Sequence, residues 1–370
     1  MENPHETTHA GMPIFTIIFT GNMFVFRSAL LTYTILSSAL CCSQQFNIRN
    51  YSVDNGLPQS SVYSIFQDNQ GFIWFGTQGG IAKYNGREFT SWSQREGLAD
   101  NHVTTIGQDA EGNLWAGHRY DGVSCFHQDS WRTHFPKGLE SDIISIQPKG
   151  ERVLALSESD GIFELGLKEG GIRLEKHIKL KELSVAKANM LKEIDGEFLL
   201  ATDNGIVNLF EDHKTSHFEG FEVLDFDKTA EYGMVAITTS GIYCEKHAKE
   251  ILPHKGIKDG KNYGTICASN KGGFWLAGKN GVTYVGEKEI QYLDATNGIP
   301  NEDVSCIIED TEGNTWFGLL GSGASQFIGD KFEAYGKNQG LRSESVLALT
   351  IDDQNRLWVA GNETLELIEY

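Results

Sequence analysis

Two histidines and one short polar segment are the residues of this sequence best suited to chemistry. The two histidines could centre the site of a lyase, while the segment that follows the second one joins aromatic and charged groups that could bind a sugar by stacking and hydrogen bonding. The predicted ligand-binding residues are His102, His118, Arg119, Tyr120, Asp121 and Arg342. The alternative for all of them is that they are ordinary polar residues of loops and turns.

Other catalytic or metal sites have weaker support in the sequence. Acidic residues are plentiful enough for a glycosidase, yet no pair of carboxylates stands out. Arginine is scarce, although a sialidase site would need a cluster of arginines. Four cysteines lie in different units and show no CxxC spacing, which indicates buried free thiols and no metal site: Cys125, Cys244, Cys267 and Cys306. We therefore expect no catalytic residue, no metal and no cofactor.

A repeated motif supplies the elements that must position these residues. Asp68 to Thr77 reads Asp-Asn-Gln-Gly-Phe-Ile-Trp-Phe-Gly-Thr, and close copies run from Asp109 to Gly117 and from Asp310 to Gly318. A looser copy starts at Asp353. The tryptophan position returns after about 40 residues, so the chain divides into eight units, of which the middle three are degenerate.

Within a unit, short runs of alternating apolar and polar residues are separated by turns. Asn85-Gly86 between two such runs is a strong hairpin signal. Four short antiparallel strands, repeated radially, make a β-propeller blade, and the repeated tryptophan then fills the wedge between neighbouring blades. The sequence thus predicts an all-β fold with a single β-propeller of about eight four-stranded blades. Seven blades are the alternative if two degenerate units between His134 and His254 merge.

The two ends of the repeated region are complementary. Residues 46–51 have the pattern of a fourth strand without its first three, and residues 346–370 have that of three strands without a fourth. An N-terminal strand that completes the last blade would close the ring and remove exposed sheet edges. In this arrangement one face of the ring carries Gln59, Ser60, Asn101, His102, His118 to Asp121, and Arg342 to Glu344.

Residues 1–43 do not fit the repeat and have the composition of a targeting region. Met23 is a candidate for the true start, and the apolar run from Ser28 to Leu40 is too short for a comfortable membrane span. A signal peptide cleaved after Ser43 would leave residues 44–370 as the β-propeller, and an uncleaved anchor is the alternative. We therefore predict an exported protein with a periplasmic or extracellular location.

The net charge of −19 argues against nucleic acid as a partner, because an acidic surface repels a phosphate backbone. The charge places no restriction on neutral ligands.

The motif from Gly56 to Phe89, with Gly-Leu-Pro, then Asp-x-x-Gly-x-x-Trp-x-Gly-Thr, then Tyr-Asn-Gly, resembles the two-component regulator propeller repeat. The resemblance implies the extracytoplasmic sensor region of a hybrid two-component system. Members of that family typically join two propellers to a small β-sandwich, a transmembrane helix and a cytoplasmic kinase or regulator.

The resulting hypothesis is a non-catalytic, ligand-sensing propeller that acts as a signal-input module. The resemblance implies a small-molecule or oligosaccharide ligand, and as signalling partner a membrane sensor kinase or further C-terminal domains. Two alternatives stay open. One is a propeller enzyme, either a lyase of the streptogramin-inactivating type or a glycosidase. The other is a secreted adhesion or scaffold propeller.

Overall fold

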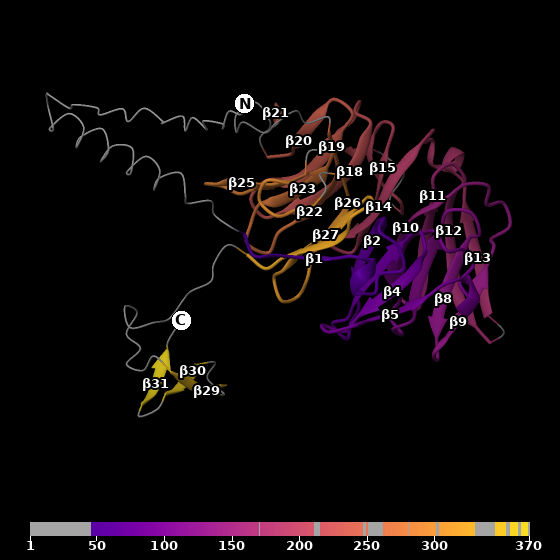
Figure 1. Cartoon of the computed structure of the whole chain (residues 1–370). Coiled ribbons are helices and arrows are strands. Elements are labelled where there is room, and N and C mark those ends of the chain that lie inside the picture. Colours follow the sequence, from indigo (N-terminus) through magenta and orange to yellow (C-terminus); the bar gives the residue numbers. More distant parts are fainter. Residues whose placement is uncertain are drawn as a thin grey trace, which may run out of the picture. The chain divides into compact units, whose positions relative to one another are not determined.

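The computed structural model describes residues 46–169, 171–210, 215–246, 249–250, 262–279, 281–300, 303–329, 345–352, 356–361 and 364–368. The expected targeting region, residues 1–43, lies outside the described residues, and so does Arg342. None of the helices in the described ranges is long and apolar enough to cross a membrane. The described chain is built almost entirely of short strands (Figure 1).

Seven four-stranded antiparallel sheets form the blades, which are numbered in chain order. The strands of each blade are given in their order in the sheet, starting with the inner strand. Blade 1 contains β2 (Val62–Gln67), β3 (Ile73–Thr77), β4 (Gly80–Tyr84) and β5 (Phe89–Trp92). Blade 2 contains β6 (Val103–Gln108), β7 (Leu114–His118), β8 (Val123–His127) and β9 (Ser130–His134). Blade 3 contains β10 (Ile143–Lys149), β11 (Arg152–Ser157), β12 (Gly161–Lys168) and β13 (Gly171–Ile178).

Blade 4 contains β14 (Ala188–Ile194), β15 (Glu197–Thr202), β16 (Gly205–Asn208) and β17 (Thr215–His217). Blade 5 contains β18 (Val223–Thr229), β19 (Gly233–Thr238), β20 (Gly241–Cys244) and β21 (Lys249–Glu250). Blade 6 contains β22 (Tyr263–Ala268), β23 (Phe274–Gly278), β24 (Gly281–Val285) and β25 (Ile290–Leu293). Blade 7 contains β26 (Val304–Glu309), β27 (Thr315–Leu319), β28 (Gly323–Phe327) and β1 (Ile48–Tyr51). Short 3-10 helices, η1 (Val53–Asn55), η2 (Gln94–Glu96) and η3 (Leu180–Leu183), lie in connections between blades.

The inner strands contact one another in cyclic order. Each of β2, β6, β10, β14, β18, β22 and β26 lies against the next, and β26 lies against β2. Blades 7 and 1 also share a buried cluster that includes Tyr51, Phe75 and Trp316. These contacts confirm the β-propeller, with seven four-stranded blades. The predicted route to seven, a merger of two degenerate units between His134 and His254, is wrong, because three separate blades lie there.

The N-terminal strand completes a different blade from the one expected. β1 pairs with β28, from Ile48 opposite Phe327 to Tyr51 opposite Ala324. The prediction that this strand completes the sheet of residues 346–370 is therefore wrong. Aromatic packing accounts for the choice, because the ring of Tyr51 stacks on Trp316 of blade 7 with 5.5 Å between centroids. Across the described ranges the blades stay separate sheets, and no sheet closes on itself.

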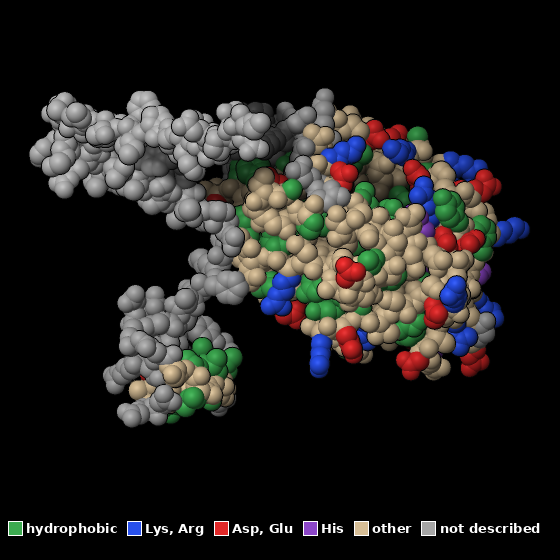
Figure 2. Space-filling view, in the orientation of Figure 1, with side chains coloured by type: hydrophobic (Ala, Val, Ile, Leu, Met, Phe, Trp, Pro, Cys, Tyr) green, Lys and Arg blue, Asp and Glu red, His purple; other side chains and the backbone are tan. Residues whose placement is uncertain are grey.

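Residues 346–368 form a three-stranded antiparallel sheet of their own. Its strands are β29 (Val346–Ile351), β30 (Leu357–Gly361) and β31 (Leu365–Ile368). Figure 2 shows hydrophobic side chains at the surface of this sheet. The exposed apolar residues are Val346, Leu347, Leu349, Ile351 and Leu365. The pattern predicted as the first three strands of an eighth blade is thus present as a separate sheet.

The repeated Asp-x-x-x-x-x-Trp pattern has one structural role. In blade 7 one oxygen of the Asp310 carboxylate accepts the backbone N–H of Asn314 at 2.7 Å, while the other accepts the indole N–H of Trp316 at 2.8 Å. The same aspartate-to-indole bond occurs in blades 1 and 2. In the three-stranded sheet the aspartate is Asp352, and the looser motif copy therefore begins one residue before Asp353. The carboxylate fixes both the turn and the tryptophan, as the structural interpretation of the motif predicts.

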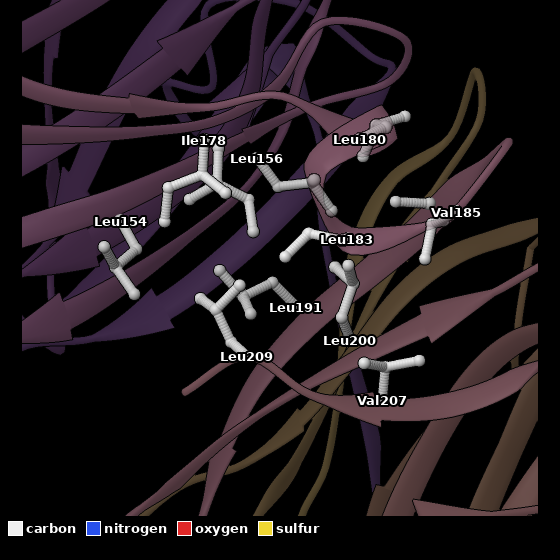
Figure 3. Packing of buried hydrophobic residues seen from close by; sticks show 12 residues of the cluster. Leu154, Leu156, Ile178, Leu180, Leu183, Val185, Leu191, Leu200, Val207 and Leu209 are labelled. Carbon is white, nitrogen blue, oxygen red and sulfur yellow. The ribbon is translucent and has the colours of Figure 1, made fainter. Parts of the chain in front are cut away.

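Aliphatic residues take the place of the tryptophan in the degenerate blades. Figure 3 shows Leu154 and Leu156 of β11 beside Leu191 of β14 and Leu200 of β15, all buried between blades 3 and 4. The wedge between these blades is filled by several branched side chains, so the fold does not need the motif in every unit.

A β-bulge occurs at the second residue of every inner strand in the ring, where one residue is left out of the register with the neighbouring strand. In three blades the bulged side chain donates a hydrogen bond to the carbonyl that begins the next inner strand. The donors are Thr104, Asn189 and Ser305, and the acceptors are the carbonyls of Ile143, Val223 and Val62 respectively. These bonds connect blades that no strand pairing joins.

Candidate functional site

The ring has two faces that differ in their connections. Turns between the first and second strands and between the third and fourth strands lie on one face, called here the lower face. Turns between the second and third strands, together with the connections between blades, lie on the other, the upper face. The predicted site residues that the structure describes all belong to the upper face or to the strand ends beneath it.

A ring of equivalent positions, the upper rim, surrounds the inner strands on this face. In every blade the residue after the second strand donates its backbone N–H to the carbonyl of the residue before the inner strand, at 2.9 to 3.2 Å. The donor and acceptor pairs are Gln78 and Ser61, Arg119 and His102, Glu158 and Asp142, Asp203 and Lys187, Thr239 and Glu222, Lys279 and Asn262, and Leu320 and Asp303. The backbone geometry is the same in all seven blades, while the side chains differ in charge, size and polarity.

An aromatic and charged cluster occupies the upper rim at blades 1 to 3. The imidazole of His102 lies against the ring of Tyr63, with 4.5 Å between centroids. The Arg119 guanidinium lies 5.5 Å from the centre of the Tyr120 ring, and its Nε is 3.5 Å from a carboxylate oxygen of Asp142. Tyr120 is 66% exposed, so its ring is available for stacking with a ligand.

The electrostatics of the cluster follow from partial burial and from Arg119. Burial lowers the pKa of His102, and the nearby Arg119 cation lowers it further. Burial raises the pKa of Asp142, and the same cation opposes that shift. His102 is therefore a neutral imidazole at neutral pH, and it can donate or accept a hydrogen bond.

His118 is not part of this cluster. It is the last residue of β7 and is fully buried, with its Nε2 2.7 Å from the hydroxyl of Ser124. Burial lowers the pKa of its imidazole to about 4. The equivalent strand ends in blades 1, 4 and 5 carry threonines whose hydroxyls donate to the carbonyl that begins the next strand. His118 thus occupies a position that supports the turn, and in this structure it is inaccessible to a ligand.

The structure brings together three of the six predicted residues, His102, Arg119 and Tyr120. Asp121 is exposed in the same turn, His118 lies beneath it, and Arg342 is outside the described residues. Sequence reasoning missed Tyr63 and Asp142. Alignment of the inner strands would have found them, because Tyr63 is a bulge residue and Asp142 precedes an inner strand.

An ion pair between the partly exposed Lys192 and the buried Asp225 lies among the inner strands of blades 4 to 6. Lys192 Nζ lies 2.8 Å from a carboxylate oxygen of Asp225 and donates to the carbonyls of Phe226 and Ile266. The other oxygen of Asp225 accepts from the backbone of Ile266. Because these contacts satisfy the pair on several sides, the pair supports the packing of the inner strands.

Two cavities adjoin described residues at the junctions of blade 7 with its neighbours. One, of about 380 Å³, lies on the lower face between blades 7 and 1, and its lining includes Arg49 and Glu312. The other, of about 370 Å³, lies on the upper face between blades 6 and 7, and its lining includes Lys279 and Asp303. The four cysteines of the ring are free thiols on the predicted strands, and in the described ranges no cluster of three or more potential ligands could hold a metal ion.

The comparisons with known proteins agree with the motif analysis. Residues 56–79, 97–120 and 298–321 match the two component regulator propeller family model. Each match begins at a glycine before an inner strand and ends in the upper-face turn of blade 1, 2 or 7. The resemblance to that repeat is confirmed. No curated protein matches the chain.

Solved structures share the fold at low sequence identity. The extracellular domain of the putative hybrid two component system BT3049 from B. thetaiotaomicron is 19% identical with a TM-score of 0.63, covering 88% of this chain and 48% of that one. The extracellular domain of the putative one component system BT4673 from the same organism is 16% identical with a TM-score of 0.60, covering 87% and 46%. The chain thus spans about half the length of these relatives.

Virginiamycin B lyase from Staphylococcus aureus has a similar fold. It is 15% identical with a TM-score of 0.59, and the alignment covers 76% of this chain and 98% of the lyase. At this identity the likeness concerns the fold alone.

Proposed function

We propose that the chain is an exported, non-catalytic propeller that binds a small molecule or an oligosaccharide and serves as the input module of a two-component sensor. The observation that carries this proposal is the exposed cluster of Arg119 and Tyr120 beside His102 on the upper rim. An accessible aromatic ring next to a charged hydrogen-bond donor suits a sugar.

Similarity to extracellular domains supports the location. Both B. thetaiotaomicron relatives are extracellular domains of signalling systems, and residues 1–43 have the composition of an export signal. Export to the periplasm or the cell surface would place the upper rim in contact with external ligands. The occupied state would then be transmitted to a membrane sensor kinase, or to further domains of a longer sensor.

The geometry of the histidines favours binding over catalysis. A general acid or base must come within hydrogen-bond distance of its substrate. His118 is fully buried, and His102 is nearly so, with its ring covered by Tyr63. Neither imidazole is presented to solvent as the centre of a lyase site would require.

Binding of the full chain to an array of defined neutral and acidic oligosaccharides tests the proposal. Tyr120→Ala and Arg119→Ala should each weaken binding, because they remove the stacking surface and the adjacent cation. Phe210→Ala is the matched control, since Phe210 is an exposed aromatic on the lower face and should not affect binding.

The same protein samples also test the alternative that the chain is an enzyme. If oligosaccharides or streptogramins are converted to products, and His102→Ala abolishes that turnover, the chain is an enzyme and the proposal is wrong. If no oligosaccharide binds, the adhesion or scaffold alternative is favoured.

A further inference from the structure

The junction of blades 6 and 7 differs from the equivalent junction of blades 2 and 3. At blades 2 and 3, Arg119 follows a second strand, Asp142 precedes the next inner strand, and the two form an ion pair. At blades 6 and 7 the corresponding residues are Lys279 and Asp303. The cavity of about 370 Å³ lies between them. No carboxylate of the described residues comes within ion-pair distance of Lys279.

A missing side chain explains the open junction. The bulge position of β22 is Gly264, whereas the bulge of β6 is Thr104, whose hydroxyl donates to the first carbonyl of the next inner strand, that of Ile143. Asn189 and Ser305 make the corresponding bond in blades 4 and 7. At Gly264 no side chain extends toward Val304, and Gly264 instead lines the cavity.

Neither backbone strain nor crowding requires a glycine at position 264. Its φ lies outside the left-handed range, and a Cβ built there meets no atom within 4 Å. This contrasts with Gly278 in the same lining, where a Cβ would lie 2.1 Å from the carbonyl oxygen of Asn262. Glycine at position 264 therefore leaves the cavity open, although the backbone there would accept a residue with a side chain.

The lining indicates the ligand chemistry. Lys279 offers a cation, Asp303 an acceptor and Asn262 an amide, while Val304 and Leu320 supply apolar surface. A volume near the lower end of the range for ligand pockets fits a molecule the size of a monosaccharide or an amino acid. We propose that this cavity is a binding site for a small polar molecule that carries one carboxylate and several hydrogen-bond donors.

This inference rests on the proposed function and adds a second ligand site to it, distinct from the cluster of Arg119 and Tyr120. The ligand carboxylate would lie against Lys279, and its hydroxyl or ammonium groups would donate to Asp303. A sugar acid and an amino acid share this chemistry, so the experiment must separate them.

The test measures binding of D-galacturonate, D-galactose and L-serine to the full chain by isothermal titration calorimetry. D-galacturonate or L-serine should bind more tightly than the neutral D-galactose, and whichever binds identifies the source of the carboxylate. Lys279→Gln should lower the affinity for the carboxylate probe by about fivefold, which corresponds to the upper value for a partly exposed ion pair. The affinity for galactose should not change. Lys187→Gln is the control, because this upper-rim lysine is paired with Glu222.

Gly264→Asn provides the second variant. The amide should occupy the cavity and reach the Val304 carbonyl as Asn189 reaches Val223, so binding should fall by about tenfold or more while the melting temperature is kept. Unchanged affinity in both variants, or failure of all three probes to bind, overturns the inference. The proposed function survives that result if oligosaccharides still bind in a manner that depends on Tyr120, and fails with it if they do not.

Discussion

The lower and upper faces of the ring are made by turns of the same seven blades, and they maintain their geometry in different ways. On the lower face of blades 1, 2 and 7, side chains hold the turn, because an aspartate accepts hydrogen bonds from the backbone and from the tryptophan indole. On the upper rim, backbone N–H and C=O groups hold the geometry in all seven blades. In these three blades the same lower-face side chains are therefore repeated, whereas on the upper rim the side chains vary from blade to blade. This variation lets the upper rim differ in chemistry around the ring, as a binding surface requires.

The largest effect is expected from removal of a lower-face carboxylate. Asp310→Ala deprives a buried indole N–H and the backbone N–H of Asn314 of their acceptor, which should cost about 4 kcal/mol of the free energy of unfolding. Chemical denaturation measures the loss. Thr311→Ala, an exposed change in the same turn, should be close to neutral, and an equal cost for both variants would contradict the role given to the carboxylate.

A pH-dependent effect should come from His118, which is fully buried beneath the upper rim. His118 has a pKa of about 4 in the folded protein and about 6.5 when unfolded, so the unfolded chain binds the proton more readily. At pH values above the unfolded pKa, the buried neutral His118 costs the folded protein no stability. As the pH falls from the unfolded pKa toward the folded pKa, the free energy of unfolding decreases, because protonation favours the unfolded chain. Between pH 7 and pH 5 the loss should be about 2 kcal/mol.

His118→Thr checks this effect, because threonine occupies the equivalent position in blade 1 as Thr77. The variant should lack that part of the pH dependence, while the contributions of carboxylates cancel in the difference between the two proteins. Denaturation curves of both proteins from pH 7 to pH 5 give the measurement. Parallel pH profiles would show that His118 is protonated equally in both states.

A smaller gain is expected where the lower-face motif is incomplete. Blade 6 has Ser269 in place of the aspartate, and the indole nitrogen of Trp275 is buried without a hydrogen-bond partner. Ser269 donates to the Glu309 carboxylate, so a lone Ser269→Asp change would bring two carboxylates together. The double change Ser269→Asp with Glu309→Gln recreates the combination of Asp310 and Gln67 at the next junction, and should add about 1 kcal/mol to the free energy of unfolding.

Thermal and chemical denaturation of the double variant and of each single variant measure this gain. The single Ser269→Asp protein should be less stable than the double. A double variant no more stable than the natural chain would mean that Trp275 gains nothing from the added acceptor.

The smallest effect on stability is expected on the upper rim itself. Arg119→Ala and Lys187→Ala each break a partly exposed ion pair, which should change the free energy of unfolding by less than about 1 kcal/mol. Arg119→Ala should still weaken ligand binding. A larger loss of stability in either variant would show that upper-rim side chains support the fold, and the contrast between the two faces would then fail.

Much of the fold could be predicted from the sequence, because the lower-face motif is made by side chains. The aspartate-to-indole bond, as between Asp68 and Trp74, requires the same residue types in each copy of the motif. The repeat and its strands can therefore be recognised in the sequence. The partner of β1 was not predictable in this way. An outer strand such as Phe89–Trp92 has no fully buried residue, and its weak pattern suits the edge of any blade.

The candidate site could be placed on a face from the sequence, but its residues could be only partly assigned. His118 and Arg119 are consecutive residues, yet His118 is the buried last residue of β7 and Arg119 lies on the upper rim. Neighbouring positions on a strand point to opposite sides, so an error of one residue exchanges a buried side chain for a rim side chain. The open space beside Gly264 was not predictable, since this residue is one of 41 glycines and the space depends on the neighbouring blade. Such features depend on contacts between blades, which a single sequence does not display.

The pairing of β1 with β28 also affects how the chain is made. Tyr51 and Gln326, which are hydrogen-bonded across this pair, lie 275 positions apart in the sequence. At a synthesis rate of about 5–20 residues per second, β1 emerges about 14–55 s before its partner. During that interval the backbone groups of β1 lack their native partner, and the ring of Tyr51 lacks Trp316, although Tyr84 and Phe89 of blade 1 are already present. Blades 1 to 6 can form in order as they emerge, but the seventh must wait for both ends of the ring, and its assembly becomes the step most exposed to aggregation.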